Sequence, residues 1–98
     1  MQNLPLDHVV ETLSVRITGR VQGVGFRAAA VRQAHRLKVT GWVRNLEDGS
    51  VEALLQGDID QVDRMLSWLD TGPPGARVTD VTNQQVFTER HFDRFQQQ

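Results

Sequence analysis

Along this chain of 98 residues, apolar side chains recur at every second residue in some segments and about every 3.6 residues in others. This alternation between strand and helix periods limits the fold more than any other feature. Leu13, Val15 and Ile17 alternate with polar residues, which is typical of a strand with one buried face. Val62 and Leu69, with the apolar residues between them, recur at helical spacing. The full pattern predicts strands over residues 13–18, 42–46, 51–56 and 78–87, a short strand over 92–95, and helices over 28–37 and 59–69.

Turn and capping residues separate these elements at the expected places. Asp48-Gly49 lies between two apolar runs and predicts a hairpin. Asp58, with Gln61 three residues on, is close to a capping box for the second helix, and Gly72 opens a Gly-Pro-Pro-Gly run that ends it. Two βαβ units joined by a hairpin predict an α+β, ferredoxin-like fold (β-α-β-β-α-β), an antiparallel sheet with two helices on one face.

Composition excludes several broad classes of protein. The chain has no Cys, so it has no disulfide framework and no Cys-based metal or redox site. No apolar run approaches the roughly 20 residues of a membrane helix, and the N-terminus lacks the apolar core of a signal peptide, so we expect a cytoplasmic monomer. The expected division is a flexible extension over residues 1–11, one domain over 12–95, and a tail over 96–98.

Charge is distributed unevenly, although the formal net charge is only −1. Residues 16–44 contain seven Arg and Lys and no Asp or Glu, whereas the rest of the chain carries 12 acidic residues against four basic ones. A basic segment within a nearly neutral domain indicates a local site for an anion, or a solvated helix face, rather than a surface for a long polyanion.

The loop over residues 19–25 joins the first strand to the first helix and contains Gly19, Gly23 and Gly25. Glycines allow successive N–H groups to point inward, and a helix start adds unpaired N–H groups and the positive end of its dipole. Arg27 follows at the junction and can bind phosphate oxygens with two donors. The segment is either a phosphate cradle or a structural turn that happens to be rich in glycine.

Two nucleotide-binding motifs fit this loop poorly. Residues 23–28 match a loose dinucleotide fingerprint, but the chain is too short for the doubly wound sheet that such a fingerprint serves. A Walker A loop needs Lys followed by Ser or Thr, which the segment lacks.

A second polar cluster is Gly41-Trp42-Val43-Arg44-Asn45, just before the predicted hairpin. Alternation places Val43 and Asn45 on one face of the strand, and Trp42 and Arg44 on the other. Asn45 is either part of the turn or a group that holds a water molecule and a substrate oxygen through its amide.

Together the two clusters resemble the acylphosphatase family. The first matches the family's loop signature as Ile17-Thr18-Gly19-Arg20-Val21-Gln22-Gly23-Val24-Gly25-Phe26-Arg27. The second matches as Gly41-Trp42-Val43-Arg44-Asn45, then Gly49-Ser50-Val51, then Gly57. The segment from Gly72 to Val78 is similar to the family's connection into the fourth strand, so the resemblance covers roughly residues 12–95.

The resemblance implies a ferredoxin-like fold and hydrolysis of the carboxyl-phosphate bond of small acyl phosphates, without metal or cofactor. By this resemblance Arg27 binds the phosphoryl group and Asn45 positions the attacking water. The phosphate-binding backbone is that of Val21, Gln22, Gly23, Val24, Gly25 and Phe26.

The residue types suit that chemistry. A carboxylate leaving group, with a conjugate-acid pKa of about 4 to 5, needs no general acid, and neither motif contains His, Asp or Glu. Alternatives are an acylphosphatase-like domain that handles carbamoyl phosphate within a much longer hydrogenase-maturation protein, and a non-catalytic anion-binding module. The predicted first and third strands carry no aromatic residues for stacking bases, so we expect no nucleic-acid partner and no membrane partner.

Overall fold

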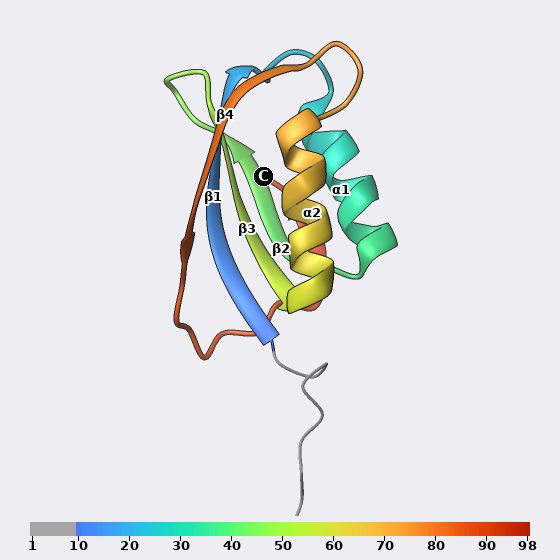
Figure 1. Ribbon diagram of the computed structural model, residues 1–98, viewed down its shortest axis with the longest axis vertical. Coiled ribbons are helices and arrows are strands. Elements are labelled where there is room, and N and C mark those ends of the chain that lie inside the picture. The colour runs from blue at the N-terminus through green and yellow to red at the C-terminus, as the bar shows by residue number, and fades with distance from the viewer. Residues whose placement is uncertain (1–9) are drawn as a thin grey trace, which may run out of the picture.

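The computed structural model describes residues 10–98 as one α/β unit with a single sheet (Figure 1). The elements are β1 (Val10–Arg20), α1 (Phe26–Leu37), β2 (Thr40–Asn45), β3 (Val51–Asp58), α2 (Ile59–Thr71), β4 (Arg77–Gln85) and β5 (Phe95–Gln97). The predicted β-α-β-β-α-β order is confirmed, and β5 follows it. Neither helix in this part of the chain is long and apolar enough to cross a membrane.

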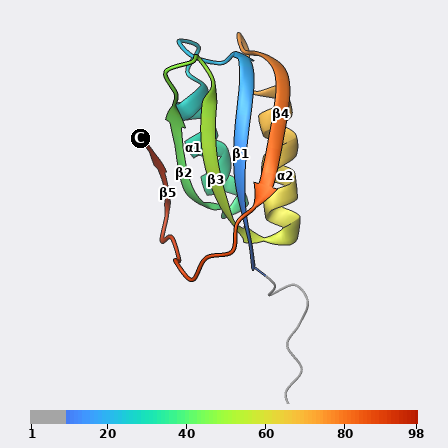
Figure 2. The same cartoon turned by 90° about the vertical axis from the view of Figure 1, so that its left-hand side faces the viewer.

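The sheet has the strand order β4-β1-β3-β2-β5, with α1 and α2 on one face and the other face open (Figures 1 and 2). The first four strands pair antiparallel, as the ferredoxin-like fold requires. β5 instead pairs parallel with β2, so the sheet is mixed rather than wholly antiparallel. It does so because residues 86–94 cross the end of the sheet and return the chain along β2.

The core lies between the helices and the covered face of the sheet. α1 contributes small side chains, Ala30 and Ala34, which lets its backbone approach the sheet closely. α2 contributes Val62, Met65 and Leu69, all fully buried, as their helical spacing predicts. The Phe26 and Trp68 rings join the two helices, with centroids 5.8 Å apart. The sheet supplies Leu13, Val15, Ile17, Val43, Val51, Ala53, Leu55 and Phe95, and the connecting segments supply Val21 and Val39.

The structure differs from the sequence predictions mainly at element ends. The short fifth strand was expected at residues 92–95 and lies at Phe95–Gln97, so the expected tail over 96–98 continues this strand. Asp58 is the N-cap of α2, but its side chain makes no capping hydrogen bond. The pairing of β4 with β1 is irregular, with a register shift between Thr18 and Gly19. The expected extension over residues 1–11 lies outside the described residues except for Val10 and Glu11, which are in β1.

Strand direction brings three distant parts of the chain to one edge of the sheet. Because β1 and β2 both run antiparallel to β3, their carboxyl ends meet at the same edge, and Ile17 and Asn45 both pair with Val51. β5 is parallel to β2 and therefore ends there as well. The loop after β1, the last residue of β2 and the end of β5 are thus neighbours.

Candidate functional site

A small pocket of about 130 Å³ lies at this edge of the sheet, where the loop after β1 leads into α1. Its lining joins the loop and the start of the helix to the last residue of β2 and to β5. The lining residues are Val21, Gln22, Gly23, Gly25, Phe26, Arg27, Ala28, Asn45 and Gln97. The glycine loop and Arg27 of the first predicted cluster therefore line one pocket with Asn45 of the second.

The backbone between Gln22 and Gly25 has the form of an anion nest. Gly23 and Gly25 have positive φ, at 74° and 75°, whereas Gln22 and Val24 do not. The sign of φ therefore alternates along the loop. Alternation of this kind turns successive N–H groups toward one point. The N–H groups of residues 22–25 donate to no backbone carbonyl within the part of the chain that the structure describes, so they remain free for a ligand.

The start of α1 adds to the same positive site. Gly25 is the N-cap residue and has no side chain that could cap the helix, and the first turn contains no acidic residue. The first intrahelical bond runs from the Ala29 N–H to the Gly25 carbonyl, at 3.1 Å. The preceding N–H groups are those that a helix leaves unpaired, and the dipole places partial positive charge on them.

Arg27 is half-buried at the pocket wall, and its guanidinium is oriented by the end of the chain. Its Nη1 donates to the backbone oxygen of Gln98 at 2.8 Å, and the Gln98 N–H donates to the Val43 carbonyl at 2.8 Å. A guanidinium has five donor hydrogens, so several remain for an anion in the pocket. Arg27 is the one charged residue among those that line the pocket in the described chain.

The other arginines of the basic segment are neutralised where the structure shows their partners. Arg16 pairs with Asp48, and Arg44 pairs with Glu52, with Nη2 and Oε1 2.6 Å apart. Arg44 also stacks over Trp42, 4.8 Å from the ring centroid, on the open face of the sheet. The predicted alternation along this strand is confirmed, because Val43 is buried on the opposite face.

Asn45 is half-buried, and its Oδ1 is buried without a hydrogen-bond partner in the described structure. A buried carbonyl oxygen of this kind costs free energy until a ligand or water donates to it. Its position beside the nest allows the amide to accept from one group and to donate to another. The arrangement can hold an oxyanion on the N–H groups and Arg27, and a water molecule on Asn45.

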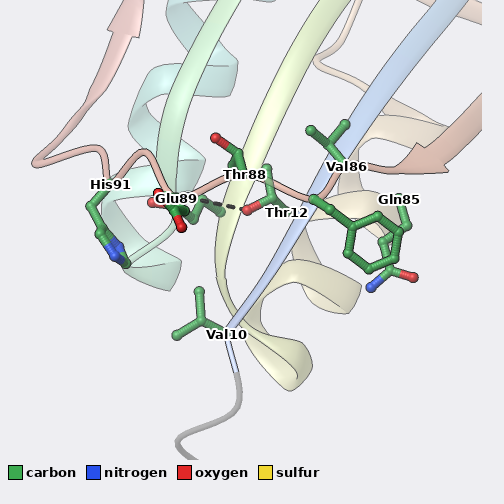
Figure 3. Close-up of a pocket in the computed structure, with 9 residues that line it drawn as sticks. Val10, Thr12, Gln85, Val86, Thr88, Glu89 and His91 are labelled. Atoms are coloured by element: carbon green, nitrogen blue, oxygen red, sulfur yellow. Dashed lines mark hydrogen bonds between the residues drawn. The ribbon is translucent and has the colours of Figure 1, made fainter.

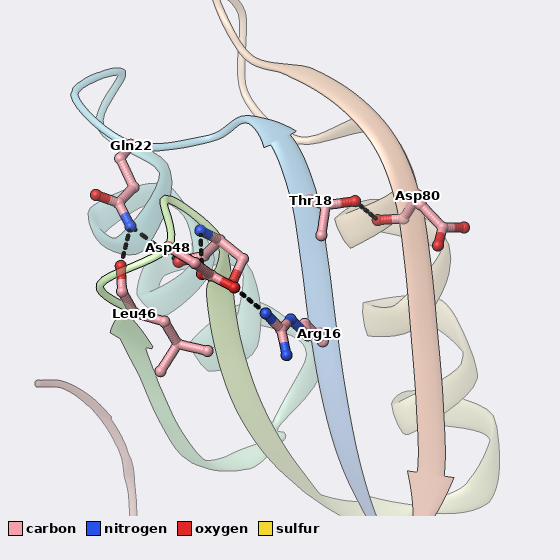
Figure 4. A network of polar contacts seen from close by, with 7 residues as sticks. Arg16, Thr18, Gln22, Leu46, Asp48 and Asp80 are labelled. Atoms are coloured by element: carbon pink, nitrogen blue, oxygen red, sulfur yellow. Dashed lines mark hydrogen bonds and ion pairs between the residues drawn. The ribbon is translucent and has the colours of Figure 1, made fainter.

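The hairpin that follows Asn45 is held by Asp48 (Figure 4). Its Oδ1 accepts from the Ser50 backbone N–H at 3.0 Å and from the Ser50 hydroxyl at 2.5 Å. These bonds, with the Arg16 guanidinium as a smaller influence, hold the pKa of the Asp48 carboxyl below its ordinary value. The same bonds favour the ionised carboxylate.

A larger hollow of about 550 Å³ lies at the opposite end of β1, around Val10, Phe87 and His91 (Figure 3). Its central polar group, Gln56, is already satisfied, because it bonds to the Thr12 hydroxyl at 3.1 Å and to the backbone of residues 90 and 92. No arginine is among its lining residues in the described chain, so the smaller pocket is the better candidate for chemistry.

Neither hollow holds a metal-ligand set. Across residues 10–98, no three His, Asp or Glu side chains come together in a way that would bind a metal ion. His35 is exposed on α1, with Nε2 3.3 Å from the Phe95 carbonyl, and takes no part in the pocket.

The structure adds residues to the lining of the predicted site. Ala28, next to Arg27 in α1, and Gln97 also line the pocket. No local pattern near the C-terminus indicates the place of Gln97, because the parallel pairing of β5 with β2 brings it there. Val24 packs against the core rather than lining the pocket.

Known proteins with similar sequences and structures agree with this geometry. The Acylphosphatase family profile matches residues 13–97. The chain is 62% identical, over all 98 residues and the whole of the relative, to an acylphosphatase of Burkholderia ambifaria. An acylphosphatase structure from Coxiella burnetii superposes with a TM-score of 0.86 at 35% identity, covering 91% of this chain and 93% of that one. The acylphosphatase of Bacillus subtilis gives 0.85 at 32% identity, covering 90% and 97%. The chain therefore belongs to the acylphosphatase family of hydrolases.

Proposed function

We propose that this protein hydrolyses the carboxyl-phosphate bond of small acyl phosphates, with Arg27 and the loop N–H groups holding the phosphoryl group and Asn45 positioning the water. The observation that carries the proposal is that Arg27, the free N–H groups and the unpaired amide of Asn45 line one pocket of about 130 Å³. A pocket of that size suits a phosphoryl group and leaves the acyl part toward solvent.

The reaction needs charge stabilisation more than proton transfer by the protein. Water attacks phosphorus in line with the leaving carboxylate, so one P–O bond forms and the P–O bond to the carboxyl oxygen breaks. The carboxylate leaves without a proton, since its conjugate acid has a pKa of about 4 to 5. The pocket lining contains no Asp, Glu or His, so the proton lost by the water passes to a phosphate oxygen.

The guanidinium and the N–H groups supply the main rate advantage. They are already aimed at the site before substrate binds, because Gln98 orients Arg27 and the glycine φ values orient the loop. Donors fixed in this way stabilise the charge that develops on the phosphoryl oxygens, at about 3 kcal/mol for each donor by comparison with oxyanion holes.

Phosphate release from acetyl phosphate and benzoyl phosphate tests the proposal directly. We expect turnover that EDTA does not reduce, with inorganic phosphate as a competitive inhibitor. Arg27→Ala should nearly abolish turnover and weaken inhibition by phosphate, whereas Asn45→Ala should reduce turnover and leave that inhibition unchanged. Normal turnover in either purified variant would remove that residue from the mechanism.

The alternatives predict different results in the same assay. A carbamoyl-phosphate-handling domain would prefer carbamoyl phosphate to acetyl phosphate by a large factor, and an anion-binding module would bind phosphate with no turnover. The proposal also includes a cytoplasmic monomer built on the domain expected over residues 12–95, which β5 extends to residue 97. Light scattering on the purified protein measures the oligomeric state.

A further inference from the structure

The side chain of Gln22 leaves the anion nest and reaches the hairpin between β2 and β3 (Figure 4). Its Nε2 donates to the Leu46 carbonyl at 2.8 Å and to the Ser50 carbonyl at 2.9 Å. Both hydrogens of the amide are therefore in use. Within the described residues, these two bonds are the only hydrogen bonds that join the loop over residues 21–25 to the hairpin over residues 46–50.

The two carbonyls lie where β2 ends and the turn closes. Leu46 directly follows Asn45, and its own N–H donates to the Ser50 carbonyl at 2.9 Å. The Gly49 N–H donates to the Leu46 carbonyl at 3.2 Å. Gln22 thus joins the nest, whose N–H groups would bind the anion, to the two backbone groups that set the position of Asn45.

We propose that Gln22 is a positioning residue, whose side chain sets the distance and angle between the phosphoryl group in the nest and the water held by Asn45. The inference rests on the proposed function and deepens it. In-line attack depends on this alignment, and a misplacement of about 1 Å can reduce a rate by about a hundredfold. The loop follows β1 and Asn45 ends β2, and β3 lies between these two strands, so a direct bond keeps the loop and the strand end in register.

A purely structural role for Gln22 predicts that its loss destabilises the fold, whereas a positioning role predicts little change in stability. Each of the two carbonyls also accepts from a backbone N–H, so loss of the Gln22 amide leaves neither one without a partner. The fold should therefore lose little stability, and phosphate should still bind, because the nest and Arg27 are intact. The effect should fall on turnover alone.

The first test compares Gln22→Met, which keeps length and removes both donors, with Gln84→Met on the exposed face of β4 as a matched control. With acetyl phosphate we expect kcat about tenfold lower in Gln22→Met, equal to about 1.4 kcal/mol of barrier. The inhibition constant of phosphate should stay within about twofold, and Gln84→Met should match the wild type. Unchanged kcat, or a loss of phosphate affinity as large as the loss of kcat, would overturn the inference.

A double-mutant cycle with Asn45→Ala provides the decisive readout. If Gln22 acts through Asn45, Gln22→Met should lower kcat by less than about twofold in the Asn45→Ala background. Full additivity would contradict a positioning role.

Gln22→Asn gives a second variant in case the methionine protein folds poorly. It keeps the amide but is too short to reach both carbonyls, so we expect a smaller loss in kcat. A wild-type kcat in Gln22→Asn would count against the inference. A wild-type protein inactive on every acyl phosphate would instead refute the proposed function.

Discussion

Replacing Asn45 with alanine separates the stability of the fold from the demands of the site. The Asn45 Oδ1 is buried with no partner in the free protein. Removal of the amide group therefore removes an unsatisfied acceptor, and asparagine has no apolar carbon beyond Cβ whose burial would be lost. We expect Asn45→Ala to be more stable than the wild type and far less active.

The magnitude follows from the cost of the unpaired oxygen. A buried acceptor without a partner costs about 1 to 3 kcal/mol. Residual van der Waals contacts of the amide group offset part of that gain, and both residue types are poor strand formers. We expect a net increase of about 1 kcal/mol in the free energy of unfolding, which raises Tm by about 4 to 8 °C in a domain of this size.

Urea unfolding with and without inorganic phosphate measures both effects in one experiment. Phosphate at about 100 times its Kd should stabilise the wild type by about 2.7 kcal/mol. Asn45→Ala should gain the same increment, because the nest and Arg27 bind the anion, and Arg27→Ala should gain almost none. Acetyl phosphate hydrolysis on the same samples gives the loss of turnover.

Two results would refute this reasoning. A decrease of 1 kcal/mol or more in the stability of Asn45→Ala, at the scale of a lost hydrogen bond, would mean that Oδ1 has a partner in the folded protein. A loss of the phosphate increment in Asn45→Ala would mean that Asn45 binds the anion rather than the water.

Three further predictions concern the nest, the core and the hairpin. Gly23→Ala should lower the free energy of unfolding by about 1 to 2 kcal/mol because φ is 74° there, although a Cβ would meet no atom within 4 Å, and it should also weaken inhibition by phosphate. The control Gly75→Ala, with φ of 92° and equally open space, should lose as much stability in urea unfolding without any change in that inhibition. Ala30→Leu should lower the free energy of unfolding by about 1 to 3 kcal/mol, because Ala30 is fully buried where α1 meets the sheet. Urea unfolding measures this loss as a lower midpoint, and an unchanged midpoint would show that the core can expand. Since the pKa of Asp48 is lowered, its bonds to Ser50 add stability above about pH 4 that is lost as pH falls through the lowered pKa. Asp48→Asn should therefore be less stable than the wild type at pH 7 in urea unfolding, and the difference should shrink as the pH falls below about 4.

The parts of the site that lie within one continuous segment could be predicted from the sequence. Gly23 and Gly25 lie between β1 and α1, and Arg27 is the second residue of α1, so local backbone geometry is enough to form the nest and to place the guanidinium beside it. Asn45 could be proposed only as one of two readings, because a residue before a turn is often part of that turn. The resemblance to a family favoured the catalytic reading, and the described structure places the side chain at the pocket.

The remaining contacts depend on strand order, which local patterns do not specify. Gln97 and the backbone oxygen of Gln98 reach the site because β5 pairs parallel with β2, and a three-residue strand has too few residues to show a period. Gln22 meets the hairpin for a similar reason, since β3 lies between β1 and β2 and the ends of both strands meet at one edge.

The amino-acid sequence by itself determined the order of the elements, the apolar faces that they bury and the chemistry available in the glycine loop, because these depend on side-chain spacing and on backbone conformation within a few residues. Only the tertiary structure decided which distant groups share the pocket and which arginines are neutralised. Long-range pairing of strands sets those distances, and Coulombic and hydrogen-bonding interactions act between groups that are close in space rather than in sequence.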